Sequence, residues 1–163
     1  MDFILFISFV IFTRLVELLH SRRNEIWLLQ RGAVEYGRKH YPFIVALHAL
    51  FLVSLIVEHC TVQNGAFNAV LLLLYFMLLA FKVWVIGSLG KFWNTRIYRV
   101  TNFPLVKKGP YKYFKHPNYL IVIAEIAIIP LVFNLYFTAI VFTILNSIML
   151  FVRIKEENKA LRI

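Results

Sequence analysis

Three short polar motifs in the last third of the chain contain the residues best suited to chemistry. In chain order they are Gly109-Pro110-Tyr111, Lys115-His116-Pro117-Asn118-Tyr119 and Arg153-Ile154-Lys155-Glu156-Glu157. Carboxylates and aromatic faces attract cations, whereas basic groups and helix N-termini attract anions. Together the motifs predict a site for a small molecule that is cationic or carries charge of both signs.

The His116-Pro117 pair predicts the start of a helix. Proline lacks an N–H group and suits the first helical position, so we expect His116 to be the N-cap. The free N–H groups of that first turn form a positive pole that binds a carboxylate or a phosphate. In the simpler alternative, the pair only caps a helix, and Tyr111 and Tyr119 are membrane-interface residues.

The carboxylates of the last motif are negative and so complement the positive pole at the His116 cap. Arg153 and Glu157 are four residues apart and share one face of a helix, with Glu156 offset by one helical step. A zwitterion fits between the motifs, with its anionic end at the His116 cap and its cationic groups near the two glutamates. The alternative is that the glutamates form a solvated helix end.

The composition requires a membrane fold to position these motifs. Of the 163 residues, 61% are hydrophobic, far above the roughly half expected of a soluble domain. Apolar runs cover residues 3–19, 43–57, 67–86, 119–133 and 135–152. We predict an all-α integral membrane protein with about five transmembrane helices. It forms a single domain over residues 1–163, with the polar motifs in 103–163. The last two runs form a helical hairpin, and the fourth run is short for a full crossing.

Positive charges gather in the two long loops and in the tail after the last run. They are Arg22, Arg23, Arg31, Arg38 and Lys39; Lys91, Arg96, Arg99, Lys107, Lys108, Lys112 and Lys115; and Arg153, Lys155, Lys159 and Arg162. Loops rich in Lys and Arg stay in the cytoplasm. The N-terminus is therefore expected outside and the C-terminus in the cytoplasm.

Four charged residues lie inside apolar runs, where each costs roughly 3 kcal/mol or more unless it is paired or hydrated. They are Arg14, Glu17, Lys82 and Glu125. All four fall in the half nearer the predicted cytoplasmic side, which predicts a polar cavity open to that side. The alternative is that Arg14 with Glu17, and Lys82 with Glu125, are two structural pairs that hold the bundle.

Residues near the membrane surface receive two further interpretations. The segment 21–39 mixes apolar and basic residues, as an interfacial helix does; alternatively, it is a basic topological anchor. Trp27, Trp84 and Trp93 are interpreted as interfacial anchors.

The remaining composition excludes several classes of function. Cys60 is the only cysteine, which excludes an internal disulfide and a multi-cysteine metal site. No G-x-G pair is present, which argues against a soluble dinucleotide-type fold. The net charge of +10 is explained by its clustering in membrane loops. Neither a metal nor a nucleic-acid partner is expected.

The three motifs, with Leu105-Val106 ahead of the glycine, resemble the isoprenylcysteine carboxyl methyltransferase family, whose relatives include phospholipid methyltransferases. These are integral membrane enzymes that use S-adenosylmethionine. In the first half, Arg14-x-x-Glu17-Leu18, Ser21-Arg22-Arg23-Asn24, Gly32-Ala33-x-Glu35 and His40-Tyr41 are similar to a bacterial branch associated with O-methylation of polyketide-derived lipids such as alkylpyrones.

The resemblance implies a role for each matching residue. Those that match family positions around the methyl donor are Leu105, Val106, Tyr111, His116, Pro117, Asn118, Tyr119 and Glu157. Arg153 matches the arginine that faces the acceptor, and Glu156 fits either role, so both are candidate catalytic residues. A sulfonium donor is cationic and suits carboxylates and tyrosine faces, and no catalytic metal is needed.

The resemblance and the motifs together predict an S-adenosylmethionine-dependent O-methyltransferase of a bacterial cell membrane, with its donor site facing the cytoplasm. The expected acceptor is lipophilic, carries an enol, phenol or carboxylate oxygen, and arrives sideways from the lipid bilayer. An isoprenylcysteine carboxylate and a phospholipid are alternative acceptors. A small transporter or membrane assembly subunit is an alternative of a different class, but a transporter needs polar features near the midplane.

Overall fold

Five α-helices and one small sheet form the part of the chain that the computed structural model describes, residues 2–62, 67–101 and 103–161. The helices are α1 (Phe3–Leu29), α2 (Tyr41–Thr61), α3 (Ala69–Leu89), α4 (Pro117–Leu131) and α5 (Tyr136–Leu161). Two 3-10 helices, η1 (Gly90–Phe92) and η2 (Gly109–Lys112), and two strands, β1 (Val34–Tyr36) and β2 (Ile97–Arg99), complete it. Arg162, counted above among the charges of the tail, lies outside the described residues.

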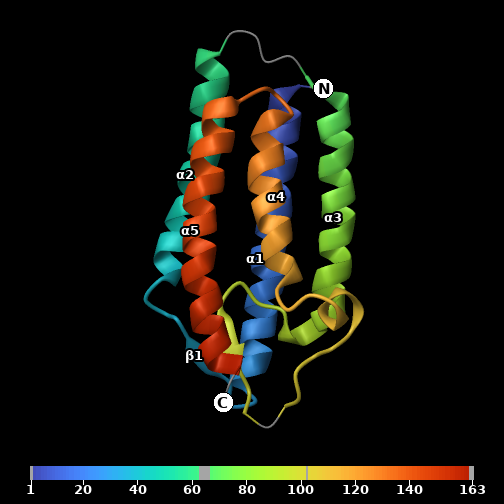
Figure 1. Ribbon diagram of the computed structural model, residues 1–163, viewed down its shortest axis with the longest axis vertical. Coiled ribbons are helices and arrows are strands. Elements are labelled where there is room, and N and C mark those ends of the chain that lie inside the picture. The colour runs from blue at the N-terminus through green and yellow to red at the C-terminus, as the bar shows by residue number, and fades with distance from the viewer. Residues whose placement is uncertain (1, 63–66, 102, 162–163) are drawn as a thin grey trace.

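The helices stand side by side, with α4 between α3 and α5 (Figure 1). A short turn joins α4 to α5, and these two helices make the most extensive contact in the bundle, so the predicted C-terminal hairpin is confirmed. α1 begins at one end of the bundle and α5 finishes at the other. The end that holds β1, β2, η1, η2 and the first turn of α4 is called the loop end below.

Four of the helices, α1, α2, α3 and α5, are long and apolar enough to cross a membrane. α4 has 15 residues, or about 22 Å at 1.5 Å per residue, which is shorter than the roughly 30 Å hydrocarbon core. The predicted all-α membrane fold is therefore confirmed, with four long helices and one short one.

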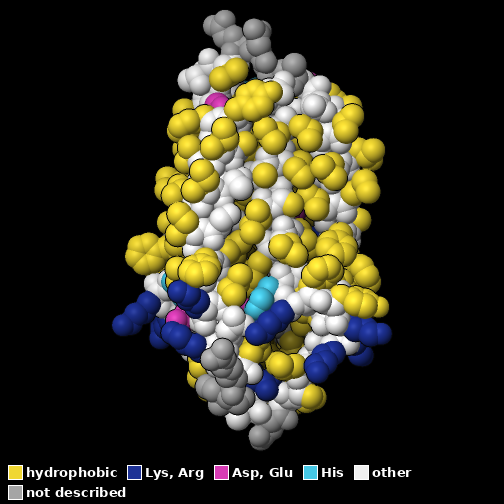
Figure 2. Space-filling view, viewed as in Figure 1, with side chains coloured by type: hydrophobic (Ala, Val, Ile, Leu, Met, Phe, Trp, Pro, Cys, Tyr) yellow, Lys and Arg dark blue, Asp and Glu magenta, His cyan; other side chains and the backbone are white. Residues whose placement is uncertain are grey.

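The outer surface of the bundle is apolar along the helices. Large hydrophobic side chains such as Ile4, Val70, Phe137 and Ile140 are more than half exposed. Figure 2 shows hydrophobic side chains covering one face along the helices, and the lysines and arginines gathered near the loop end. An apolar exterior of this extent is stable in lipid and not in water. The side of the membrane that the loop end faces stays a prediction.

An aromatic core fills the end of the bundle opposite the loop end. Phe6 of α1 packs edge-on against Tyr75 of α3, and Phe133 beyond α4 lies against Phe3 and Phe6. These side chains, Phe3 apart, are almost fully buried. They hold α1, α3 and α4 together at this end of the bundle. The cavities described below lie nearer the loop end.

The segment 21–39 is not an interfacial helix, so that interpretation is wrong. Its first part continues α1 to Leu29, and β1 follows and pairs antiparallel with β2. The cause is tertiary contact: Ser21 Oγ bonds with Asn94 and Thr95, and the Asn24 amide donates to the carbonyl oxygen of Trp93 at 2.7 Å. These bonds attach the end of α1 to the loop that follows α3.

The four charged residues inside the apolar runs form one network and not two separate pairs. Arg14 donates to Glu17 and Glu125 at 3.1 and 2.9 Å, and the Lys82 ammonium contacts both carboxylates. The network joins α1, α3 and α4. It also borders a cavity, but the surface of that cavity is mostly apolar, so the predicted polar cavity is not confirmed. The ion pairs join three helices, as the structural alternative proposed, although as one network.

Candidate functional site

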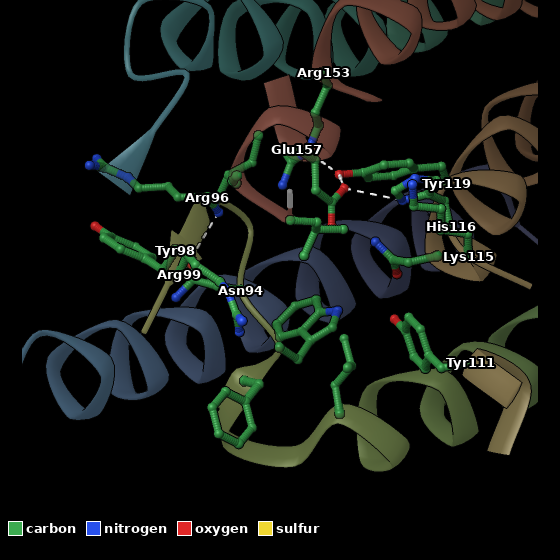
Figure 3. A pocket seen from close by; sticks show the side chains of 17 residues that line it. Asn94, Arg96, Tyr98, Arg99, Tyr111, Lys115, His116, Tyr119, Arg153 and Glu157 are labelled. Carbon is green, nitrogen blue, oxygen red and sulfur yellow. Dashed lines mark hydrogen bonds and ion pairs between the residues drawn. The ribbon is translucent and has the colours of Figure 1, made fainter. Parts of the chain in front are cut away.

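A chain of polar contacts joins the start of α4 to the end of α5. Arg153 Nε donates to the Tyr119 hydroxyl at 2.8 Å, and that hydroxyl donates to Glu157. His116 Nδ1 lies 3.3 Å from the same Glu157 oxygen, Oε2. Figure 3 shows Arg153, Tyr119, Glu157 and His116 pointing toward one another. Motifs that are separated by about 35 residues in the chain therefore form one cluster.

α4 starts where the sequence predicts, but the His116 side chain does not do what an N-cap side chain usually does. α4 begins at Pro117 with His116 as the N-cap residue, as predicted. The imidazole makes no capping hydrogen bond. It stacks on the Tyr119 ring and contacts Glu157 and Asn158, both at 3.3 Å. The predicted N-cap position of His116 is therefore confirmed, while its side chain contacts α5 and does not cap the helix.

A small polar cavity of about 90 Å³ lies beside this cluster, and it is called the polar cavity below. Its walls come from the end of α3, the segment 92–99, η2, the start of α4 and the end of α5. The charged and hydrogen-bonding side chains that line it are Asn94, Arg96, Tyr98, Arg99, Tyr111, Lys115, His116, Asn118, Tyr119, Arg153 and Glu157. This set combines several cationic groups with one carboxylate.

A larger cavity of about 310 Å³ extends from the cluster into the bundle and is mostly apolar, and it is called the apolar cavity below. Its walls come largely from α1 and α2. Leu15 and Leu18 of α1 and Val45 of α2 border it and are about half exposed on the outer surface. The cavity therefore opens sideways between α1 and α2, at the level of the apolar exterior.

The two cavities share one wall. Trp93, Asn94, Asn118, Tyr119 and Arg153 line both of them, and these five residues are called the shared wall below. Trp93 and Arg153 are 4% and 8% exposed. Two buried polar atoms of this wall, Trp93 Nε1 and Asn118 Oδ1, have no hydrogen-bond partner among the described residues. Buried polar atoms of this kind need a partner, which a ligand in either cavity can provide.

Protonation near the polar cavity follows from burial. Burial and the bond to Glu25 raise the pKa of Tyr98 to about 12. Burial and the charge of Glu157 raise the pKa of Tyr111 well above its ordinary value. Both phenols are therefore protonated and neutral near pH 7. Burial and the charge of Arg153 lower the pKa of His40, which stays neutral as well.

The structure brings most of the predicted site residues together. Those that line the polar cavity are Tyr111, His116, Asn118, Tyr119, Arg153 and Glu157. Leu105, Val106, Pro117 and Glu156 line neither cavity. Leu105 is exposed in the loop before η2, and Pro117 is buried in the first turn of α4.

The position of Glu156 has a simple cause. Successive helical residues are rotated by about 100° around the axis, so with Glu157 facing the cavity Glu156 points elsewhere. Its carboxylate pairs with Lys159 at 2.5 Å on the same helix. Of the two glutamates, only Glu157 lines the polar cavity.

The sequence interpretation missed Trp93 and Asn94. Trp93 is buried in the shared wall, so its interpretation as an interfacial anchor is wrong. Both residues reach the site because the end of α1 holds the segment that follows η1. The signal available in the sequence was weak: an Asn-Thr pair directly after a tryptophan, in a loop otherwise rich in basic residues.

Comparison with known proteins gives an independent assignment. Residues 69–163 match the isoprenylcysteine carboxyl methyltransferase (ICMT) family. The chain is 42% identical to the uncharacterized protein YpbQ of Bacillus subtilis, over 98% of this chain and 96% of that protein. It is 30% identical to an uncharacterized protein of Haemophilus influenzae, over 86% of this chain and 84% of that protein. No solved structure matches. The chain belongs to the ICMT family, which indicates a membrane methyltransferase.

Proposed function

We propose that this member of the family is an S-adenosylmethionine-dependent methyltransferase acting on an acidic oxygen of a lipophilic acceptor. The observation that carries the proposal is the shared wall, where a polar and an apolar cavity meet at the same five side chains. Methyl transfer requires the donor carbon and the acceptor atom to approach to roughly 3–3.5 Å in line. Two cavities of opposite character with one common wall suit a charged donor and a lipid acceptor.

The side chains of the polar cavity suit the donor. Glu157 can pair with its cationic groups, and the ring of Tyr111 offers a face to a sulfonium. Arg99 Nε is buried without a partner among the described residues and can donate to the donor carboxylate. When bound, S-adenosylmethionine supplies an electrophilic methyl group. The polar cavity encloses about 90 Å³, less than the roughly 300–1,000 Å³ of ligand sites, so its walls must move apart on binding.

The apolar cavity suits the acceptor. It is more than three times as large as the polar cavity, its surface is mostly apolar, and it opens between α1 and α2 where lipid surrounds the bundle. A lipid can thus reach the shared wall without leaving the apolar phase. Its head group then lies against Arg153 and Tyr119, beside the polar cavity.

An acidic oxygen is the nucleophile that these side chains favour. An enol, phenol or carboxylate oxygen is anionic or nearly so at neutral pH, so its reaction mainly requires positioning and desolvation. Arg153 can stabilise that anion, and the unpartnered Trp93 N–H can donate to it. His116 contacts Glu157 and is not available as an isolated base. An amine would need a base to remove its proton and would gain nothing from Arg153.

Three lipids distinguish the possible acceptors. We expect purified protein with isotopically labelled donor to methylate a long-chain hydroxypyrone. Methylation of phosphatidylethanolamine alone would contradict the oxygen nucleophile. Methylation of a prenylcysteine alone would keep that nucleophile and reject a polyketide-derived lipid as the acceptor.

We further propose that the loop end faces the cytoplasm of a bacterial cell. The positive charges of the long loops collect at this end, and such charges are retained in the cytoplasm. The donor is a cytoplasmic metabolite, which agrees with this orientation.

A further inference from the structure

The end of the apolar cavity that lies deepest in the bundle is charged. Arg14 and Glu17 of α1 and Lys82 of α3 line it, and Glu125 of α4 completes their network. The Lys82 and Glu125 side chains are each 2% exposed, whereas the Arg14 side chain is 20% exposed. Of the two cations in the network, Arg14 is therefore the more accessible to a molecule in the cavity.

Arg14 also has hydrogen-bonding capacity to spare. The Lys82 ammonium has three N–H groups, and carboxylate oxygens of Glu17 and Glu125 lie within bonding distance of it at three positions. The Arg14 guanidinium has five N–H groups, and within the described part of the chain two of them are bonded, one to Glu17 and one to Glu125. The network thus has satisfied carboxylates and unsatisfied N–H donors, which favours an oxygen ligand over a cationic one.

This polar end is separated from the shared wall by an apolar stretch. Tyr119 and Glu125 are six residues apart on α4, or about 9 Å along the helix. The cavity between them is bordered by aliphatic residues, among them Ile44, Val122 and Leu150. A molecule in the cavity therefore meets polar groups at two levels, and apolar walls in between.

We propose that Arg14 binds a second oxygen of the acceptor, a hydrogen-bond acceptor placed on the tail side of the molecule, at the depth of the charge network. The inference rests on the proposed function, because it takes the apolar cavity to be the acceptor site. It defines the substrate class more narrowly: a lipid with a nucleophilic oxygen at the shared wall and a carbonyl, hydroxyl or ether oxygen about two helical turns deeper. Lipids with one polar group are poor ligands.

A purely structural role for the network makes a different prediction. If Arg14 only joins the helices, its loss weakens the binding of every acceptor to the same extent. If Arg14 binds the second oxygen, its loss weakens one of two matched lipids selectively. The informative quantity is therefore the ratio of two affinities, which general loosening of the bundle does not change.

The test uses two lipids that differ in one oxygen: a long-chain 4-alkylphenol, and the same phenol with a keto oxygen on the third carbon of its chain. Binding to the full-length protein in lipid nanodiscs is measured by calorimetry. We expect the ketone to bind about tenfold tighter, the effect of one charge-assisted hydrogen bond. Similar affinities, or no binding of either lipid, would overturn the proposal.

Two variants and one control assign the preference to Arg14. Arg14→Leu with Glu17→Leu removes one cation and one carboxylate and leaves the Lys82–Glu125 pair, bonded at 2.9 Å. We expect the affinity ratio to fall to near one in this double variant, and Arg14→Lys serves instead if the double variant does not fold. Arg31→Lys changes an exposed arginine outside both cavities and should keep the wild-type ratio. A ratio that persists without Arg14 would overturn the assignment.

Methylation measured on the same two lipids separates the two proposals. A preference for the ketone in binding, with neither lipid methylated, would contradict the proposed function and leave the Arg14 site in place. Methylation of both lipids with equal affinity would contradict the Arg14 site and leave the proposed function in place.

Discussion

Tyr119 connects the residues that face the two cavities. Its hydroxyl accepts a hydrogen bond from Arg153 and donates one to Glu157, and its ring stacks on His116. One residue of α4 thereby orients two residues of α5. In the proposed function, Arg153 contacts the acceptor and Glu157 contacts the donor. The Tyr119 hydroxyl holds both side chains.

Tyr119→Phe keeps the ring and removes both hydrogen bonds. We expect the affinity for S-adenosylmethionine, measured by calorimetry, to fall about tenfold because Glu157 loses the group that orients it. Tyr113→Phe is a matched control, since Tyr113 is 76% exposed and lines neither cavity. Equal donor affinity in the wild type and Tyr119→Phe would show that the hydroxyl does not support the donor site.

Arg153→Lys keeps the charge in the shared wall but loses the planar guanidinium. We expect turnover to fall on the order of a hundredfold, as when a group that stabilises developing charge is removed. Donor affinity should stay within a few fold of the wild type. A parallel loss of donor affinity would mean that Arg153 serves the donor through Tyr119 and does not orient the acceptor.

The sequence identified site residues where they belong to a local motif. Tyr111, His116, Asn118, Tyr119, Arg153 and Glu157 all reach the polar cavity. Trp93 was misinterpreted, because its burial depends on a bond between Asn24 and a loop almost 70 residues away. Glu156 was predicted to fit either the donor or the acceptor role, because the sequence does not fix which face of α5 turns inward.

At the scale of elements, the gap between α1 and α2 gives the apolar cavity its opening. The proposed path of the acceptor passes through it.

Val45→Trp narrows this opening with a side chain that lipid accommodates well. We expect the KM for the lipid acceptor to rise about tenfold, because access is obstructed at the protein surface. Donor affinity should not change. Leu73→Trp on α3 is the control, since Leu73 is 62% exposed and borders neither cavity. An unchanged KM in Val45→Trp would place the path of the acceptor elsewhere.

Helices followed from the sequence more readily than their connections. Apolar runs and the His-Pro pair fixed α2, α3, the start of α4 and the hairpin, because these signals are local. The extension of α1 to Leu29 and the pairing of β1 with β2 depend on contacts between residues more than 60 positions apart. A single sequence contains no local signal for such contacts.

At the scale of the whole molecule, the predicted orientation places the loop end in the cytoplasm and the opposite end of the bundle outside. α2 starts at the loop end and finishes at the opposite end, where Cys60 is exposed. Because Cys60 is the only cysteine in the sequence, one thiol reports on one side of the membrane.

We expect a membrane-impermeant maleimide to label Cys60 in intact spheroplasts. Positive charge at the loop end holds that end in the cytoplasm, which leaves the opposite end outside. Cys60→Ser is the negative control. Cys60→Ser with Lys112→Cys moves the thiol to η2 and should react only after lysis. The reverse pattern, with Cys60 protected until lysis, would contradict the orientation.

The most direct measurement of the central claim follows the methyl group into lipid. Cells that express the wild type, Arg153→Lys or Glu157→Ala at equal levels are grown with methyl-labelled methionine, from which the donor is made, and their lipids are extracted. We predict a labelled lipid in wild-type cells that is strongly reduced with either variant, with the label on an ether or ester oxygen. Identical labelled lipids in all three strains and in cells without the protein would contradict the claim that this protein methylates a lipid.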